Sequence, residues 1–247
     1  MKEKYLCLNK LKGIFLLLMF GMLLGLFFIP AEAQLIIGAK GGITVSNFSN
    51  TSPHTDVTQG YNIGFFGAYQ LSEVLSFQME LEMLQQGGQL VTVEDLSRIG
   101  AKSFQYPFPM KVRDSKVTIN NLNIPLILKY RLISSTGLNI YINAGGSAGI
   151  NIFTHSKETI TAPSADGMTY VTFTENNGVT REYQFWQFTA CGGLTFDIPL
   201  LSRNVLFDVR YYYGINAIKN GHSYLDTPII MSDISTNTLS ITIGTTL

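Results

Sequence analysis

Residues 75–83 read L-S-F-Q-M-E-L-E-M, so that apolar and polar side chains alternate at every position. Successive side chains of a β-strand point to opposite faces, and this period of two therefore predicts a strand. One face carries the apolar residues Leu75, Phe77, Met79, Leu81 and Met83. The other face carries Ser76, Gln78, Glu80 and Glu82. Such a strand separates two different surroundings, one apolar and one polar.

The same alternation continues through the rest of the chain. It is clear in three further segments, 122–132, 138–152 and 205–215, and weaker in four more, 35–48, 61–71, 183–198 and 238–247. A transmembrane β-strand takes about 9–11 residues at a tilt, and each of these segments is long enough. The sequence therefore predicts an all-β chain with eight strands that can cross a bilayer.

The connections between these strands alternate in length. Short links at 72–74, 133–137 and 199–204 alternate with long polar segments at 49–60, 87–117, 153–182 and 217–235. Outer-membrane barrels have short periplasmic turns and long outer loops, whereas a soluble sandwich has no reason to sort its loops in this way. We therefore predict an eight-stranded antiparallel up-and-down transmembrane β-barrel.

The bulk of the apolar faces indicates which side of the wall meets lipid. An eight-stranded barrel has an interior only wide enough for side chains. The apolar faces carry large Leu, Ile, Phe, Tyr and Met residues, whereas the opposite faces carry mainly Gly, Ala, Ser, Asn and Thr. The small and polar faces fit the interior, so the apolar faces should point outward. The alternative, a secreted lipocalin-like carrier with an apolar interior, is disfavoured.

The first 33 residues have the composition of a secretory signal peptide. Four lysines within residues 1–12 precede an apolar run at 14–29, and Ala31-Glu32-Ala33 forms a cleavage signal. A permanent membrane anchor is the alternative, because the run approaches the length of a spanning helix. Cleavage would leave residues 34–247 as the barrel domain in the outer membrane. Cys191 would then be its one cysteine, which excludes an intramolecular disulfide.

The polar faces of three strands carry charged residues, which we expect inside the barrel. An isolated buried charge is costly, so these residues should pair with one another. The expected network consists of Glu80, Glu82, Lys129, Arg131, Asp208 and Arg210. We interpret it as a structural plug, with a proton or ion path as the alternative.

The sequence offers little for catalysis. His54, His155 and His222 lie in predicted outer loops, and the last two are each followed by serine. Some outer-membrane barrels are lipid-modifying enzymes with a His/Ser pair, but a nucleophile needs a base within hydrogen-bond reach and a third group that orients it. Adjacent loop residues do not supply this arrangement. We therefore expect no catalytic site.

Metal, cofactor and nucleic-acid sites are also not expected. Asp166, Asp226 and Asp233 are scattered without the spacing of a known metal motif. The glycine-rich stretch at 145–149 lacks the ending of a phosphate loop, and glycines in a barrel strand permit bending and close packing. Charged residues make up 14% of the 247 residues and the net charge is zero, which disfavours nucleic acid as a partner.

Three segments resemble a known family. The stretches G-A-K-G-G-I (38–43), N-L-N-I-P-L-I-L-K-Y (121–130) and A-G-G-S-A-G (144–149) are similar to those of the PorT-like outer-membrane β-barrel family. The resemblance implies an eight-stranded barrel. The founding member is associated with a protein-secretion and maturation system, but no motif here carries that role. The chain ends in Leu247, whereas barrels of this kind commonly end in an aromatic residue.

These observations favour a non-enzymatic outer-membrane protein with a side-chain-filled lumen. It would act through its extracellular loops or periplasmic turns, in envelope structure, adhesion or as a secretion accessory. Its expected partners are outer-membrane lipids and envelope or secretion-system proteins, and we expect a monomer. The alternatives are a narrow pore or transport accessory and a lipid-modifying enzyme.

Overall fold

The computed structural model describes residues 35–49, 56–95, 110–163, 170–200, 203–218 and 234–247. These residues form nine β-strands and one short 3-10 helix, which confirms the all-β class. The elements are β1 (Leu35–Ser49), β2 (Thr58–Gln70), β3 (Leu75–Asp95), β4 (Met110–Ser135), β5 (Leu138–Pro163), β6 (Tyr170–Gly178), η2 (Thr180–Glu182), β7 (Trp186–Leu200), β8 (Arg203–Gly214) and β9 (Ser235–Thr246). None of the described residues forms a helix long and apolar enough to cross a membrane. The predicted signal peptide lies outside the described residues.

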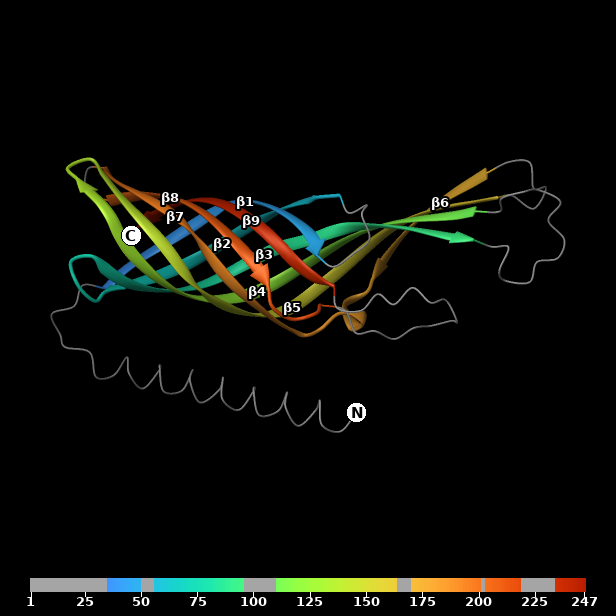
Figure 1. The fold of residues 1–247 in the computed structure, drawn as a ribbon, viewed down its shortest axis with the longest axis horizontal. Helices are drawn as coiled ribbons and strands as arrows, with labels where there is room; N and C mark the ends of the chain where they lie inside the picture. The colour runs from blue at the N-terminus through green and yellow to red at the C-terminus, as the bar shows by residue number, and fades with distance from the viewer. Residues whose placement is uncertain (1–34, 50–55, 96–109, 164–169, 201–202, 219–233) are drawn as a thin grey trace, which may run out of the picture. The chain divides into compact units, whose positions relative to one another are not determined.

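Eight of the strands close into a ring. The order around it is β4-β3-β2-β1-β9-β8-β7-β5, and a further pairing of β4 with β5 completes the barrel (Figure 1). Strand pairs with a described register, such as β3 with β4 and β8 with β9, are antiparallel. The predicted eight-stranded antiparallel barrel is therefore confirmed. β6 lies outside the ring, because it pairs only with β5.

Short turns gather at one end of the barrel, here called the turn end (Figure 1). β2 and β3 are joined by residues 71–74, where the Leu75 amide donates a 3.1 Å hydrogen bond to Ser72 Oγ. Residues 136–137 join β4 to β5, and residues 201–202 join β7 to β8. The three predicted short links are thus confirmed. The opposite end, here called the loop end, is where β6 lies.

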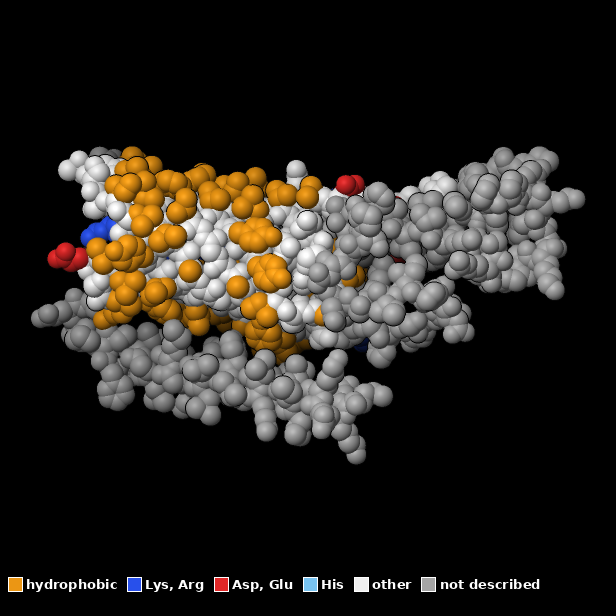
Figure 2. All heavy atoms as spheres, viewed as in Figure 1, with side chains coloured by type: hydrophobic (Ala, Val, Ile, Leu, Met, Phe, Trp, Pro, Cys, Tyr) orange, Lys and Arg blue, Asp and Glu red, His pale blue; other side chains and the backbone are white. Residues whose placement is uncertain are grey.

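The outer wall of the barrel is apolar and its interior is polar. On β2, Ile63 and Phe65 are 58% and 63% exposed, whereas Asn62 between Tyr61 and Ile63 is fully buried. Figure 2 shows apolar side chains spread over the wall, with charged ones toward its ends. This distribution is the reverse of a soluble barrel and is typical of a wall that faces lipid. It confirms the predicted orientation of the strand faces.

At the loop end, β3, β4, β5 and β6 continue beyond the ring as a four-stranded sheet. We call this part, residues 87–95, 110–118, 155–163 and 170–178, the outer sheet. The predicted loops 87–117 and 153–182 are therefore wrong over much of their length, because they contain strand. Both faces of such a sheet can meet water, so that the apolar–polar alternation that reveals a strand in the membrane wall is absent.

A β-bulge separates the barrel part of β5 from its outer part. Asn121 pairs with Asn151 and Asn120 with Phe153, which leaves Ile152 without an opposite residue. Ile152 and Phe153 are consequently both exposed, at 50% and 49%. A bulge inserts one residue and so reverses which later side chains point to which face.

The glycine-rich stretch lies within β5, as its interpretation as a strand predicted. A side-chain carbon at Gly145 would lie 2.1 Å from the Leu126 carbonyl oxygen of β4. At Gly149 it would lie 1.9 Å from Asn123 Oδ1. These glycines let the β4 backbone and an interior asparagine approach β5 closely.

Candidate functional site

The interior of the barrel holds a cluster of buried charges. Lys40 comes from β1, Glu80 and Glu82 from β3, and Asp208 and Arg210 from β8. β3 and β8 are four strands apart around the ring in either direction. Contacts between these two strands therefore cross the full width of the lumen.

Arg210 makes the central contact of this cluster. Its Nη1 lies 2.9 Å from Glu80 Oε2 and its Nη2 lies 3.1 Å from Glu80 Oε1. Nη2 also lies 2.7 Å from Asp208 Oδ2 on its own strand. A guanidinium that meets a carboxylate through two parallel hydrogen bonds forms a strong and directional pair. The Arg210–Glu80 pair thus ties opposite walls of the barrel together.

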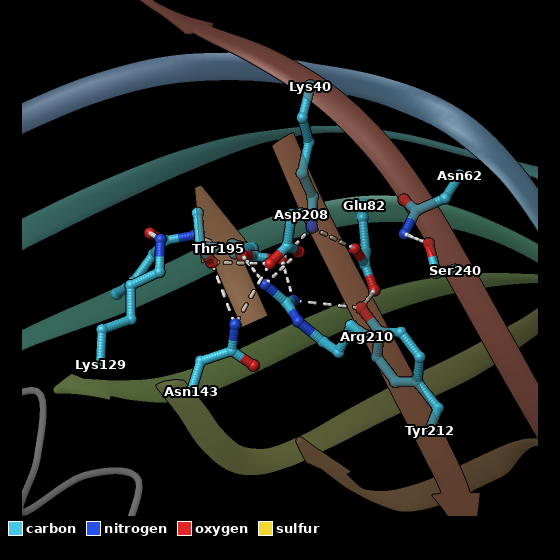
Figure 3. Close-up of polar contacts among 12 residues, drawn as sticks. Lys40, Asn62, Glu82, Lys129, Asn143, Thr195, Asp208, Arg210, Tyr212 and Ser240 are labelled. Carbon is cyan, nitrogen blue, oxygen red and sulfur yellow. Dashed lines mark hydrogen bonds and ion pairs between the residues drawn. The ribbon is translucent and has the colours of Figure 1, made fainter. Parts of the chain in front are cut away.

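Lys40 and Tyr212 complete the cluster (Figure 3). Lys40 Nζ pairs with Glu80 and lies 3.0 Å from Glu82 Oε2. The Tyr212 hydroxyl donates a 3.0 Å hydrogen bond to Glu82 Oε1 and accepts one of 3.2 Å from Arg210 Nη1. Neither residue was among those expected in the network from the sequence. The alternation of strand faces could have identified both as interior residues. Lys40 lies at an even position of β1, whereas the outward Ile43 and Val45 lie at odd positions, and Tyr212 follows Asp208 and Arg210 at steps of two.

Lys129 reaches the cluster through an intermediate residue. Its Nζ donates a 2.8 Å hydrogen bond to Gln78 Oε1, and Gln78 Nε2 donates to Glu80. The expected direct pairing of Lys129 within the charge network is corrected, because Lys129 faces Ser76 across the β3–β4 pair, four residues from Glu80. The sequence does not show this offset, since the register between neighbouring strands depends on the stagger of the barrel.

Arg131 does not join the cluster, which corrects a second expectation. Its side chain is half-buried near the turn end, where it hydrogen bonds with Tyr141, its neighbour on β5. Its backbone amide donates to the Val74 carbonyl of the β2–β3 turn at 2.8 Å. Among the described residues it forms no ion pair with Glu80 or Glu82. Arg131 has the parity of an interior residue, but it lies beyond the closed part of the lumen.

The charges at the centre of the barrel balance. The three cations Lys40, Lys129 and Arg210 lie with the three carboxylates of Glu80, Glu82 and Asp208. In the ion pairs among Lys40, Arg210 and these carboxylates, each side chain is at most 10% exposed. Removing a charge from water is costly, and the cost is offset here by direct pairing and by hydrogen bonds. The central cluster thus carries no net charge, while a fourth buried carboxylate, Asp197, lies toward the turn end and accepts a 3.1 Å hydrogen bond from Asn204 Nδ2.

Two further layers close the barrel toward the loop end. In the first layer, Asn121 Nδ2 donates to Gln187 Oε1 at 2.7 Å and Thr238 Oγ1 donates to Gln86 Oε1 at 3.1 Å, while Gln86 also donates to Gln187. The second layer is a buried apolar cluster of Phe48, Val117, Ile119, Tyr183, Ile218 and Ile234. Together, these layers separate the charged cluster from the loop end.

Toward the turn end the lumen opens into a small vestibule. This cavity of about 70 Å³ is lined by residues that include Glu73, Gln78, Lys129, Tyr141 and Asp197. A second cavity of about 10 Å³ lies next to Lys129 and the charged cluster. A void of about 10–15 Å³ holds one water molecule, so the second cavity offers no passage for a larger solute.

The described residues show no arrangement for catalysis or metal binding. His155 is half-buried and stacks on Phe153, whereas Ser156 is buried. Consecutive strand residues point to opposite faces, so His155 and Ser156 do not form a base–nucleophile pair. Within the described ranges, no group of His, Cys, Asp and Glu side chains could hold a metal ion. His54, His222, Asp166, Asp226 and Asp233 lie outside these ranges.

Cys191 faces the interior, as predicted. It is a free thiol, 7% exposed, and packs with Ile127 and Tyr212. It fills the space beside the charged cluster.

Known structures with the same kind of fold are similar to this chain at low sequence identity. Neisserial surface protein A is 9% identical, covers 87% of this chain and 98% of its own, and has a TM-score of 0.45. The attachment invasion locus protein Ail of Yersinia pestis is 12% identical, with coverage of 86% and 98% and a TM-score of 0.37. CarO of Acinetobacter baumannii is 13% identical, with coverage of 83% and 96% and a TM-score of 0.35.

A comparison with curated protein sequences gave no significant match. The family model described as outer membrane protein beta-barrel domain matches residues 31–220, which is more than half of the chain. The chain therefore belongs to this family of outer membrane β-barrel proteins.

Proposed function

We propose that this protein is a non-enzymatic barrel of the outer membrane that acts through its ends rather than through its lumen. The observation that carries this proposal is the Arg210–Glu80 pair, which crosses the lumen between strands on opposite sides of the ring. A barrel whose interior is bridged and filled in this way anchors the protein in the membrane and does not carry solutes across it. Its specific contacts are then made at its two ends.

The loop end offers the larger surface for such contacts. β4 and β5 have 26 residues each, against about 9–11 residues needed to cross a bilayer. The excess residues build the outer sheet. With the turn end in the periplasm, as is general for outer-membrane barrels, the outer sheet extends outside the cell. We propose that it presents a surface for adhesion or for contact with envelope and secretion-system proteins.

The two alternatives have weaker support. A narrow pore would need a continuous path, whereas the charged cluster, the glutamine and asparagine layer and the apolar cluster occupy successive levels of the lumen. A lipid-modifying enzyme would need a base and a nucleophile within reach, and His155 and Ser156 point to opposite faces of β5.

The finer family assignment is part of the proposal. The I-P-L-I-L-K-Y stretch that resembles the PorT-like family lies on β4, where it places Pro125, Ile127 and Lys129 inside the barrel. We propose PorT-like membership, export by a cleaved signal peptide that ends at Ala33, and a monomer surrounded by outer-membrane lipids. The secretion role of the founding member is not carried over.

Cysteine labelling in intact cells tests the proposed orientation. Thr174→Cys places a thiol on exposed β6, and Ser72→Cys places one in the exposed β2–β3 turn. A membrane-impermeant maleimide should label the first variant in whole cells and the second only after the outer membrane is opened. The unchanged protein is the control, because Cys191 is buried. Labelling of Ser72→Cys but not of Thr174→Cys in whole cells would reverse the orientation and refute the proposal.

A further inference from the structure

Two lysines face each other on the outer sheet. Lys116 of β4 and Lys157 of β5 are direct cross-strand partners, and both are exposed. Like charges directly opposite each other destabilise a strand pair. Among the described residues, neither lysine forms an ion pair. The sheet thus keeps an unfavourable pair of cations where two neutral residues would be more stable.

The acidic residues nearby neutralise this pair only in part. Asp114 lies two residues from Lys116 on the same face, but its two carboxylate oxygens accept hydrogen bonds of 2.8 and 2.9 Å from Gln89 Nε2. Glu158 adjoins Lys157 in the strand and therefore points to the opposite face, where Glu175 is its partner on β6. Asp114 keeps its negative charge in these hydrogen bonds, so the described side chains of this face hold two ammonium groups against one carboxylate. An excess of one positive charge therefore remains beside Lys116 and Lys157.

The β-bulge at Ile152 creates this pair. Before the bulge, the even-numbered residues of β5, such as Ile150 and Ile152, lie on the outer face; after it, Phe153, His155 and Lys157 do. Without the extra residue, Lys157 would point to the interior face of β5. Bulges often re-aim a side chain near a functional site. His155, half-buried and stacked on Phe153, lies on the same face between the apolar wall and Lys157.

The lysine pair lies just beyond the apolar wall. The Tyr61 hydroxyl donates a 3.3 Å hydrogen bond to Asn120 Oδ1, and Asn120 pairs with the exposed Phe153. Tyrosines with one apolar and one polar side mark the membrane–water boundary. Lys116 lies four residues from Asn120 along β4, and Lys157 lies four residues from Phe153 along β5. On a strand tilted by about 45°, this spacing places the lysines roughly 9 Å above the Asn120–Phe153 pair. That is the depth of the lipid headgroups.

We propose that Lys116 and Lys157, with His155 beside them, bind a phosphate group of a phosphorylated glycolipid in the outer leaflet. Two ammonium groups on neighbouring strands can donate hydrogen bonds to the same phosphate. A phosphate between them would remove the repulsion that the protein alone retains. The apolar wall below, with exposed Ile152 and Phe153, would contact the acyl chains of the same lipid. This inference rests on the proposed orientation in the outer membrane.

Binding of lipid A to the folded barrel in a neutral detergent tests the site. Native mass spectrometry would count the bound lipid, with diphosphorylated lipid A and fully dephosphorylated lipid A as probes. Each lysine near a lipid surface contributes about 1 kcal/mol, so Lys116→Gln/Lys157→Gln should weaken binding of the phosphorylated lipid by at least about tenfold. Lys116→Arg/Lys157→Arg should retain it. Arg203→Gln, which removes an exposed cation near the turn end, is the matched control and should bind like the unchanged protein.

Equal binding of the two lipids, or unchanged binding by the glutamine variant, would overturn the proposal. A second readout separates this outcome from a failure to fold. Without lipid, Lys157→Gln should unfold at the same or a slightly higher temperature than the unchanged protein, because it removes a like-charge pair. If all variants form the folded barrel but none binds lipid A, the site is refuted while the barrel stands. If Thr174→Cys is not labelled in whole cells, the orientation itself has failed.

Discussion

The barrel wall and the outer sheet are built from the same strands but follow different rules. In the wall, β4 places Leu128 and Tyr130 outward at 47% and 48% exposure, whereas Lys129 between them is 6% exposed. In the outer sheet, the same strand continues with Lys116 exposed and Asp114 half-buried. The alternation of apolar and polar residues is therefore imposed by the two surroundings of the wall, and a β-strand does not need it. Substitutions should accordingly have large effects in the wall and small ones in the sheet.

The largest effect should come from Arg210→Met. It leaves Glu80 and Asp208 buried without their guanidinium partner, which we expect to destabilise the folded barrel by about 3–5 kcal/mol. The matched control is Arg131→Met, which removes a half-buried arginine outside the charged cluster and should cost less than about 1 kcal/mol. The measurement is unfolding of the refolded protein by urea in one lipid composition. Equal losses in the two variants would show that Arg210 does not hold the lumen together.

Tyr212→Phe should have the next largest effect. The change removes the hydrogen bond to Glu82 and leaves the rest of the side chain in place, at a cost of about 1.5–3 kcal/mol for a buried bond to a charged group. Tyr213→Phe is the control, because Tyr213 is 54% exposed on the outer wall. Its loss should stay within about 0.5 kcal/mol. The same urea unfolding compares them, and a larger loss for Tyr213→Phe would contradict the assignment of the two faces.

Gly145→Ala tests the close approach of β4 and β5. The added methyl group would lie 2.1 Å from the Leu126 carbonyl oxygen, so the backbone must shift, at a cost of about 1–3 kcal/mol. The neighbouring Gly146→Ala would meet its nearest atom, the Thr189 carbonyl oxygen, at 3.5 Å. It should be neutral or slightly stabilising, since alanine loses less conformational entropy than glycine. Urea unfolding that ranks the two variants in the reverse order would refute this packing.

The smallest effect on the barrel should follow from Thr159→Pro in the outer sheet. Thr159 pairs with Asp114 on β4 and with Thr174 on β6, and proline removes its amide donor and disrupts the ladder. We expect the free energy of unfolding of the barrel to change by less than about 0.5 kcal/mol. Limited digestion with trypsin should nevertheless cut faster after the exposed Lys157, because the sheet opens locally. A loss above 1 kcal/mol would mean that the outer sheet stabilises the wall.

The sequence predicts the wall well because lipid and interior select different side chains. The four strongly alternating segments all lie in barrel strands, and their outward and inward faces are as predicted. The alternation of short and long connections likewise predicts the closed ring. β6 and the outer parts of β3, β4 and β5 could not be predicted in this way, because their two faces do not show such a contrast.

The candidate site was predictable only in part. Parity identifies Glu80, Glu82, Asp208 and Arg210 as interior residues, and the structure brings them together. The odd or even position of a residue in a strand does not show how far along the barrel axis its side chain lies. Lys129 therefore contacts the carboxylates only through Gln78, and Arg131 lies near the turn end. Lys40 was missed because the glycine-rich β1 alternates weakly.

Recordings of ion current across a planar bilayer test the central claim, that the lumen is closed by its own side chains. The refolded protein would be inserted from detergent, with insertion confirmed by its heat-dependent mobility on gels. We expect no stable current steps above the baseline, because the pairing of Arg210 with Glu80 and the layers above it leave no continuous water path. Large, stable current steps from the unchanged protein would contradict this expectation and favour the narrow-pore alternative.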